Sequence, residues 1–244
     1  MTGRAMQALI FDCDGVLVDT ERDGHRVAFN QAFAALGIDR QWSVTRYGEL
    51  LKTAGGKERM RRDFVETGWP VPEAERDEFI AEAHKLKTGL FMELIRSGAL
   101  PLRPGIARIV DEAIAGGVKM AVCSTSNEQA VQAVVDVMLG PERAPHLPVF
   151  AGDVVPAKKP DPAIYLLASD KLGLDAARCL VVEDSNNGLR AAKGAGMRCL
   201  VTTSSYTGGE DFSAADRIVP ELGDGADTRI TLDDCRALVE GRNG

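Results

Sequence analysis

The stretch that decides the fold is QALIFDCDGV, residues 7–16, in which an apolar run ends in two aspartates and a glycine. The run is continuous rather than alternating, which is typical of a strand in a parallel sheet covered on both faces. Similar apolar runs follow at residues 120–123, 149–151, 179–182 and 199–201. Helical patterns of apolar residues occur around and between them at residues 105–117, 127–139, 163–172 and 188–196. This alternation predicts a doubly wound α/β core built on a parallel sheet.

One long segment breaks the alternation of strands and helices. Residues 21–98 contain no convincing strand, and their apolar spacing predicts helices at residues 26–36, 57–66 and 73–96. We therefore expect an α-helical domain, residues 21–98, inserted after the first strand. The remaining residues, 1–20 and 99–244, are expected to form the α/β core domain.

Composition excludes several classes of protein. The formal net charge of −7 over 244 residues argues against nucleic acid as a partner, because that requires a basic surface. No apolar run is long enough to span a membrane, so we expect no membrane partner either. The five cysteines lack CxxC pairing and lie mostly in apolar runs, which favours reduced, buried thiols and a reducing compartment.

The first pair of candidate catalytic residues is Asp12 and Asp14. Ligands of open α/β sheets bind beyond the carboxyl ends of the strands, where both aspartates are expected to lie. A turn opened by Gly15 can direct both carboxylates into one cleft. One carboxylate can then attack phosphorus while the other moves the proton of the leaving group. Because aspartate and glycine also form ordinary turns, an Asx-rich turn without catalytic function is the alternative for these residues alone.

Ser124, Thr125 and Lys159 are the candidate phosphate-binding residues. Ser124 ends a strand with a hydroxyl donor, and the backbone N–H groups that follow, from Thr125 on, can bind phosphate oxygens near a helix N-terminus. An ordinary helix cap explains this serine equally well. Lys159 precedes Pro160 in a loop, where its charge could neutralise a phosphate; a solvated loop lysine is the alternative. We prefer it to Lys158 because it stands directly before Pro160, and partly because of a family resemblance given below. We also expect a cis bond before Pro160 that aims the lysine inward.

Glu183 and Asp184 are the candidate metal ligands contributed by another strand end. Adjacent carboxylates favour a hard cation with oxygen ligands, and the chain has only three histidines, which suits Mg²⁺ better than Zn²⁺. The alternative is an acidic helix start capped by Ser185 or Asn186.

Taken together, these segments resemble the signature motifs of the haloacid dehalogenase (HAD) superfamily of phosphohydrolases. The resemblance is carried by DCDGVLVDTE at residues 12–21, KKPDP at 158–162 and EDSNNG at 183–188. It covers essentially the whole chain and implies a HAD-like, Rossmannoid doubly wound parallel sheet with an inserted α-helical C1 cap domain.

The resemblance also implies a role for each motif residue. Asp12 is the expected nucleophile and Asp14 the expected general acid/base. The phosphoryl group is expected to be held by Ser124, Thr125 and Lys159. The expected ligands of Mg²⁺ are Asp12, Asp14 through its carbonyl, Glu183 and Asp184.

Further segments look like those of CbbY-type sugar-bisphosphate phosphatases, the plant form in particular. These segments are YGELLK at residues 47–52, GGKERM at 55–60, LRPG at 102–105 and AGDVV at 151–155. That family converts xylulose-1,5-bisphosphate, an inhibitor of Rubisco, to xylulose 5-phosphate and phosphate. The resemblance implies a functional link to Rubisco through this inhibitor, and a chloroplast stroma location for a mature form, with a bacterial cytoplasm as the alternative.

The inserted domain is expected to recognise the part of the substrate distant from Asp12. A second phosphate needs a cationic or N–H-rich holder, and the GGKER segment supplies both. A loop followed by a solvated helix is the alternative for that segment. The expected substrate-binding residues are Glu21, His25, Tyr47, Gly55, Gly56, Lys57, Arg59 and Lys87. The assignment of His25 is weakened by one extra residue relative to the bacterial CbbY pattern.

The motifs leave the fate of the phosphoryl group open. A mutase resembling beta-phosphoglucomutase returns it to the sugar rather than to water, with the same motif residues. A HAD phosphatase of another small sugar phosphate is the other alternative. The leading hypothesis is a Mg²⁺-dependent phosphatase that acts through an aspartyl-phosphate intermediate.

Overall fold

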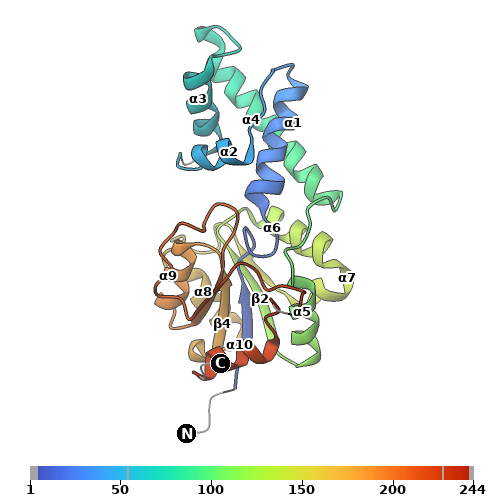
Figure 1. The fold of residues 1–244 in the computed structure, drawn as a ribbon, viewed down its shortest axis with the longest axis vertical. Coiled ribbons are helices and arrows are strands. Elements are labelled where there is room, and N and C mark those ends of the chain that lie inside the picture. The colour runs from blue at the N-terminus through green and yellow to red at the C-terminus, as the bar shows by residue number, and fades with distance from the viewer. Residues whose placement is uncertain (1–4, 54, 227, 242–244) are drawn as a thin grey trace. The chain divides into compact units, whose positions relative to one another are not determined.

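The computed structural model describes residues 5–53, 55–226 and 228–241 of the chain. It divides into two compact units. In Figure 1 the colour runs along the chain from blue at the N-terminus to red at the C-terminus. The larger unit comprises Met1–Asp19 and Pro101–Gly244, and the smaller unit comprises Thr20–Leu100. Each unit has its own core and is described by itself.

The larger unit is built on a parallel sheet. Its strands are β1 (Ala8–Phe11), β2 (Lys119–Ser124), β3 (Val149–Ala151), β4 (Cys179–Glu183), β5 (Arg198–Thr202) and β6 (Arg217–Val219). Within the described residues they form one six-stranded sheet in the order β3-β2-β1-β4-β5-β6, and every neighbouring pair is parallel. The chain therefore winds outward from β1 in both directions, which confirms the predicted doubly wound α/β fold.

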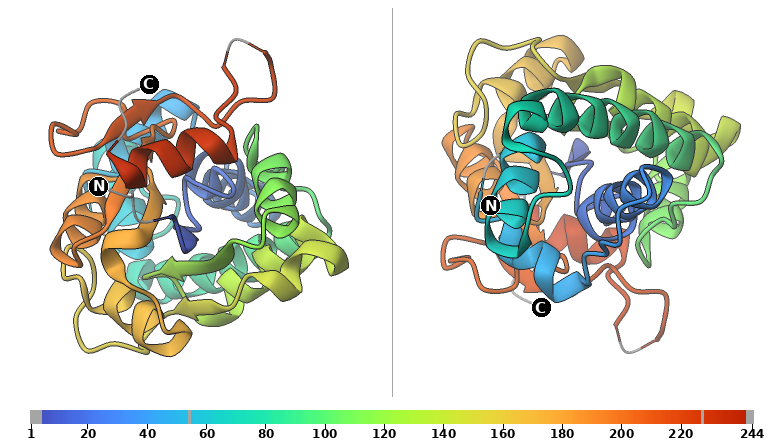
Figure 2. Two further views of the ribbon diagram at one scale, coloured as in Figure 1. Left: turned by 90° about the horizontal axis from the view of Figure 1, so that it is seen from below. Right: turned by 90° about the horizontal axis from the view of Figure 1, so that it is seen from above.

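Helices cover both faces of this sheet (Figures 1 and 2). They are α5 (Ile106–Ala115), α6 (Glu128–Val134), α7 (Gly140–Arg143), α8 (Ala163–Leu172), α9 (Asn186–Gly194) and α10 (Leu232–Glu240). A π-helical turn, Val135–Leu139, continues α6. Helices α8 and α9 contact each other on one face, and α5 and α10 contact each other on the opposite face.

The continuous apolar runs of the strands are explained by this double cover. Ile10 and Val181 belong to the buried cluster shared with α8 and α9, whereas their neighbours Leu9 and Leu180 point to the other face. All four side chains are 0% exposed. A strand buried on both faces has no position for a polar residue until it ends, and this places the first polar residues of each strand at the edge of the sheet.

The smaller unit is helical. It contains a π-helical turn (Thr20–His25), α1 (Arg26–Ala35), α2 (Val44–Leu50), α3 (Gly56–Thr67) and α4 (Arg76–Arg96), the last preceded by a 3₁₀ turn at Glu73–Glu75. Helix α1 packs along α4. The core between the helices is aromatic, with Phe29, Phe33 and Trp42 in mutual ring contact. Among the described residues of this unit, none lies in a strand, as predicted.

Four of the labelled strands and helices in the described residues were not predicted from the sequence: β6, α2, α10 and the four-residue helix α7. Strand β6 has only three residues, two of them exposed, so it carries no apolar run. Helix α2 and helix α10 both have capping signals that could have revealed them: the Ser43 side chain accepts from Arg46 N, and Thr231 forms a capping box with Asp234.

The expected state of the cysteines is confirmed. All five are free and buried. Burial raises the pKa of the Cys123 thiol to about 12, which makes this group a poor nucleophile. As for membranes, no helix in the described part of the chain combines the length and the apolar character needed to cross one.

Candidate active site

The carboxyl ends of three adjacent strands bring the first candidate residues together. Strands β2 and β4 flank β1 on its two sides. Asp12 follows β1, Ser124 ends β2 and Glu183 ends β4. All three side chains are buried at this edge of the sheet, which is the position where open α/β sheets bind their ligands.

The turn after β1 lies tightly against Asp184. The Cys13 carbonyl accepts a hydrogen bond from Leu17 N at 3.0 Å, and Gly15 N donates to the Val18 carbonyl at 2.8 Å. Gly15 has a φ of +79°, a conformation that glycine adopts without strain. A Cβ at this position would lie 2.0 Å from Asp184 Oδ2, so the turn can approach the acidic group only because residue 15 is a glycine.

Lys159 lies at the centre of the site. Its Nζ donates to Asp12 Oδ1 at 2.6 Å, to Glu183 Oε1 at 2.6 Å and to the Cys123 carbonyl at 2.9 Å. The Lys159–Pro160 peptide bond is cis, as predicted. Lys158 points elsewhere: its Nζ pairs with Asp153 at 2.8 Å and bonds the Gly152 carbonyl. The structure therefore brings the preferred lysine, and not its neighbour, to the candidate nucleophile.

Glu183 is fixed by donors on both carboxylate oxygens. Oε1 accepts from Lys159 and from the Tyr165 hydroxyl at 2.7 Å, while Oε2 accepts from Asp184 N at 3.1 Å and from the Ser185 hydroxyl at 3.3 Å. Tyr165, on α8, is fully buried and was not singled out from the sequence, where it reads as one more apolar residue of a helix. Glu183 therefore links Lys159, through Oε1, to the backbone of Asp184, through Oε2.

The start of α9 leaves room for Glu183 only because residue 188 is a glycine. A Cβ there would lie 1.8 Å from Glu183 Cδ. Alanine favours a helix over glycine by about 1 kcal/mol, but overlap with a fixed, buried carboxylate costs about 1–3 kcal/mol or more. We therefore expect Gly188→Ala to lower the free energy of unfolding, measured by urea denaturation.

Gly194 on the same helix supplies the matched control for this prediction. Its added Cβ would meet Pro162 Cβ at 3.4 Å, an ordinary contact. Gly194→Ala is expected to leave the stability unchanged or to raise it by up to about 1 kcal/mol. Equal stability of the two alanine variants would contradict the proposed close packing of Glu183.

Two serine hydroxyls bind the Asp14 carboxylate. Its Oδ2 accepts from the Ser126 hydroxyl at 2.5 Å and from the Ser124 hydroxyl at 3.5 Å. Ser126 N in turn donates to Ser124 Oγ at 3.1 Å. Ser126 was missed because one of several hydroxyl residues in a loop carries no distinguishing signal. Thr125, between the two serines, is half-buried, and its carbonyl faces Lys158 Nζ at 3.5 Å.

Three carboxylates are close enough to share one cation. Ligand atoms of Asp12, Glu183 and Asp184 all lie within 4.8 Å of one another. Burial raises the pKa of Asp12 well above its usual value, against the opposing charge of Lys159. Burial and then the charge of Glu183 raise the pKa of Asp184 to about 7. A divalent cation would offset both effects, and its preferred ligands are oxygens, so the donor set fits Mg²⁺.

The expected substrate-binding residues of the smaller unit fall into two contact groups. In the first, the Tyr47 hydroxyl donates to Glu21 Oε2 at 2.5 Å, and Arg59 Nη1 donates to the same hydroxyl at 3.2 Å. In the second, Lys87 Nζ lies 2.9 Å from His25 Nδ1. Burial lowers the pKa of Lys87 to about 8 and that of His25 well below its usual value, which favours a neutral imidazole that accepts from the ammonium.

The GGKER segment forms the first turn of α3. Gly55, at φ +90°, precedes the helix and Gly56 begins it. A Cβ on Gly56 would lie 2.8 Å from His84 Nε2. Lys57 is exposed, whereas Arg59 turns inward and bonds the Thr53 carbonyl at 3.0 Å. The structure thus groups Arg59 with Glu21 and Tyr47 but leaves Lys57 on the surface.

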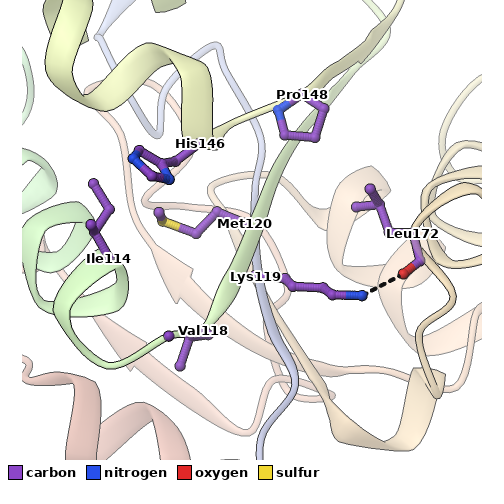
Figure 3. A pocket seen from close by; sticks show the side chains of 8 residues that line it. Ile114, Val118, Lys119, Met120, His146, Pro148 and Leu172 are labelled. Carbon is purple, nitrogen blue, oxygen red and sulfur yellow. Dashed lines mark hydrogen bonds between the residues drawn. The ribbon is translucent and has the colours of Figure 1, made fainter.

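A separate pocket of about 400 Å³ lies at the other edge of the sheet (Figure 3). It is lined by Val118, Lys119 and Met120 at the start of β2 and by His146 and Pro148 before β3. Lys119 Nζ is already bonded to the Leu172 carbonyl at 2.8 Å. Because β2 runs from this pocket to Ser124, the pocket and the acidic cluster are at opposite ends of the strand.

Comparison with known proteins shows which family the chain resembles. A family model for haloacid dehalogenase-like hydrolases matches residues 6–196. A CBBY-like protein of Arabidopsis thaliana is 58% identical over 95% of this chain and 74% of its own length. Protein CbbY of Rhodobacter capsulatus is 44% identical over 89% of this chain and 94% of its own.

A solved structure is similar over most of the chain. It is a mutant of CbbY from Rhodobacter sphaeroides in complex with xylulose-1,5-bisphosphate, with a TM-score of 0.70 and 42% identity, covering 90% of this chain and 96% of that one. The chain therefore belongs to the haloacid dehalogenase-like hydrolases. Within that family it is a CbbY-like phosphatase.

Proposed function

We propose that this protein is a Mg²⁺-dependent phosphatase that hydrolyses xylulose-1,5-bisphosphate to xylulose 5-phosphate and phosphate. The observation that carries the proposal is the contact of Lys159 Nζ with Asp12 Oδ1 at 2.6 Å, beside the acidic pair Glu183 and Asp184. A buried carboxylate next to a fixed ammonium is suited to attack phosphorus while the charge of the phosphoryl oxygens is neutralised. The choice of sugar rests on the similarity to the mutant of CbbY from Rhodobacter sphaeroides that was solved in complex with xylulose-1,5-bisphosphate, of which this chain covers 96%.

In the proposed reaction Asp12 attacks phosphorus and the bond to the sugar oxygen breaks. Asp14 donates its proton to that leaving oxygen, and an aspartyl phosphate remains on Asp12. Asp14 then accepts a proton from water, whose oxygen attacks the same phosphorus; the bond between phosphorus and Asp12 breaks, which releases inorganic phosphate and restores the Asp12 carboxylate. Ser124 and the backbone N–H of Thr125 hold the phosphoryl oxygens together with Lys159. The hydroxyl of Ser126 keeps the Asp14 carboxylate in place.

We assign Mg²⁺ to Asp12, Glu183, Asp184 and the carbonyl of Asp14. When bound, the ion supplies positive charge that neutralises the phosphoryl oxygens and keeps the carboxylates ionised. EDTA is expected to abolish phosphate release, and excess MgCl₂ to restore it. Phosphate release that persists in EDTA would contradict this assignment.

Recognition of the sugar and of its second phosphate is assigned to the smaller unit. Arg59 is the cation of the first contact group and can offer a bidentate fork to phosphate. The N–H groups of Gly55 and Gly56 and the side chain of Lys57 add donors at the start of α3. Glu21, Tyr47 and His25 are the proposed hydroxyl partners. Lys87, whose ammonium lies 2.9 Å from His25 Nδ1, is proposed to bind the substrate together with His25.

A phosphate-release screen tests the proposal. The substrates are xylulose-1,5-bisphosphate, ribulose-1,5-bisphosphate and glucose 1-phosphate, each with the purified chain and MgCl₂. We expect the fastest release from xylulose-1,5-bisphosphate. Conversion of glucose 1-phosphate to glucose 6-phosphate without free phosphate would instead establish a mutase. Fastest release from another sugar phosphate would keep the chemistry and overturn the substrate.

The proposed location is the chloroplast stroma. Identity to the plant relative, 58%, exceeds identity to the bacterial one, 44%, and this favours the stroma over a bacterial cytoplasm. The proposed link to Rubisco is removal of its inhibitor and requires no contact between the two proteins. Detection of the protein outside the stroma by immunolocalisation would contradict the assignment.

A further inference from the structure

Arg103 holds together the loops that surround the catalytic turn. Its Nη1 donates to the Gly15 carbonyl, and also to the Thr202 carbonyl at 3.2 Å. Its Nη2 donates to the carbonyls of Thr203 at 2.8 Å and Pro220 at 2.6 Å. One guanidinium therefore joins the turn after β1 to the chain that follows β5 and β6.

The backbone of Arg103 is tied to the same turn. Arg103 N donates to the Leu17 carbonyl at 2.8 Å, and Leu102 forms an antiparallel bridge with Val18. The side chain and the main chain of this segment thus hold two separate points of the turn, Gly15 and Leu17. Such a double attachment restricts sliding of the turn along the edge of the sheet as well as its rotation.

The position of Gly15 matters because of what lies beside it. A Cβ on Gly15 would meet Asp184 Oδ2 at 2.0 Å, so the turn and the Asp184 carboxylate are in close packing. Gly15 follows Asp14 directly. A shift of the Gly15 carbonyl would therefore displace the candidate acid/base and change its distance from the acidic cluster.

We propose that Arg103 is a positioning residue for the phosphatase reaction, which fixes the turn carrying Asp12 and Asp14 against Asp184 by binding the Gly15 carbonyl. The proposal rests on the proposed function of this site. Arginine suits the task because its planar fork presents five N–H donors in fixed directions, whereas a lysine ammonium cannot span the same carbonyls.

Arg108 provides a matched comparison. Like Arg103 it binds the C-terminal segment 220–223, but it does not bind the turn after β1. Its Nη2 donates to the carbonyls of Leu222 at 3.0 Å and Gly223 at 2.6 Å, and its Nη1 donates to Glu112 at 2.9 Å. Arg108 also pairs with Asp224 at 3.5 Å, and in the described chain none of these partners belongs to the turn after β1, residues 12–18. An arginine that binds the C-terminal segment and α5, but not the turn, is thus available for substitution.

The test compares Arg103→Met and Arg103→Lys with Arg108→Met in the full chain. We expect Arg103→Met to lower kcat roughly 10- to 100-fold with KM changed less than about three-fold, since small misplacements of reacting groups act on the chemical step. Arg103→Lys is expected to recover part of the loss. Arg108→Met is expected to keep kcat within about two-fold even at an equal loss of thermal stability.

A second readout needs no substrate: the rise in Tm on addition of MgCl₂ is expected to be smaller in both Arg103 variants than in Arg108→Met. Equal kcat losses in Arg103→Met and Arg108→Met, or a normal kcat in Arg103→Met, would overturn the proposal. If Arg103→Met does not fold, Arg103→Lys decides by the same comparison. If the wild type releases no phosphate, the proposed function fails, and the MgCl₂-induced Tm shift alone decides whether Arg103 positions the turn.

Discussion

Asp12→Asn is expected to abolish phosphate release while the protein stays folded. The asparagine amide cannot form the aspartyl phosphate, and loss of an attacking group typically lowers kcat by at least about 10³-fold. We expect binding of the sugar phosphate to persist, because the other groups of the site remain. The measurement is single-turnover phosphate release with MgCl₂, with mass spectrometry of the purified variant to show that asparagine has not reverted to aspartate.

The same substitution is expected to raise the free energy of unfolding by up to about 1 kcal/mol, because groups that serve catalysis are often destabilising. Burial opposes the charge of Asp12, and Lys159 only partly offsets the combined effect of burial and of repulsion by Glu183, Asp14 and Asp184. An amide carries no charge to desolvate, and its oxygen can still accept from Lys159.

Asp170→Asn is the control for Asp12→Asn. Asp170 is an exposed residue of α8, so it undergoes the same chemical change away from the sheet edge. Its kcat and its stability are expected to match the wild type. Full phosphate release by Asp12→Asn would refute the nucleophile and, with it, the proposed mechanism.

The sequence predicted the arrangement of the sheet edge because parallel strands impose it. A strand that is buried on both faces becomes polar only where it ends, so Asp12, Ser124 and Glu183 could be located from the ends of apolar runs alone. The parallel sheet then brings those ends together. The same reasoning fails for β6, whose three residues include an exposed arginine and an exposed isoleucine.

The groups that orient the candidate catalytic residues could not be predicted in this way. Tyr165 is indistinguishable in sequence from a core aromatic residue. Its role becomes visible only in the structure, where its hydroxyl donates to Glu183 Oε1 at 2.7 Å. Arg103 contacts Pro220 across more than a hundred residues of chain. Such contacts depend on how separate loops fold back, and neither periodicity nor local spacing records that.

Two glycines illustrate which features local sequence predicts and which features depend on tertiary packing. The sequence suggested that Gly15 opens a turn, and its φ of +79° agrees. Gly188 gave no such signal, because it lies within a helix, where glycine is merely unfavourable. A glycine is needed at position 188 because the Glu183 carboxylate occupies the space that a Cβ would fill.

Lys159→Met is expected to produce the second large effect, on both activity and stability. Loss of the ammonium removes a fixed charge aimed at the phosphoryl oxygens, which typically lowers kcat by about 10²- to 10³-fold. It also leaves the buried carboxylates of Asp12 and Glu183 without their shared cation. Removing one partner of a buried ion pair typically costs roughly 3–5 kcal/mol of stability.

The stability loss of Lys159→Met is expected to depend on pH with a definite sign. Lys159 is the group that lowers the pKa of Asp12, so its removal raises that pKa further above the value in the unfolded chain. The folded state then binds more protons than the unfolded state, and the free energy of unfolding falls as pH rises. The gap between wild type and variant should therefore be wider at about pH 8 than at about pH 5 in urea denaturation without metal.

Lys158→Met is the matched control, because it changes the neighbouring residue in the same way. Lys158 is an exposed lysine whose partner Asp153 is also exposed, and such surface pairs contribute at most about 1 kcal/mol. Its kcat is expected to fall less than about five-fold, far below the loss from removing a fixed charge in the site. A larger loss in Lys158→Met than in Lys159→Met would reverse the assignment of the two lysines.

A double-mutant cycle between Asp12 and Lys159 isolates their contact from the other effects. If the loss in Lys159→Met arises from an unpaired Asp12 carboxylate, then the same substitution made in Asp12→Asn should cost less, because the amide needs no cation. Glu183 still loses its ammonium in both backgrounds, so part of the cost should remain. An identical cost in the two backgrounds would show that Lys159 stabilises the fold through Glu183 and the Cys123 carbonyl, and that its 2.6 Å contact with Asp12 contributes nothing to stability.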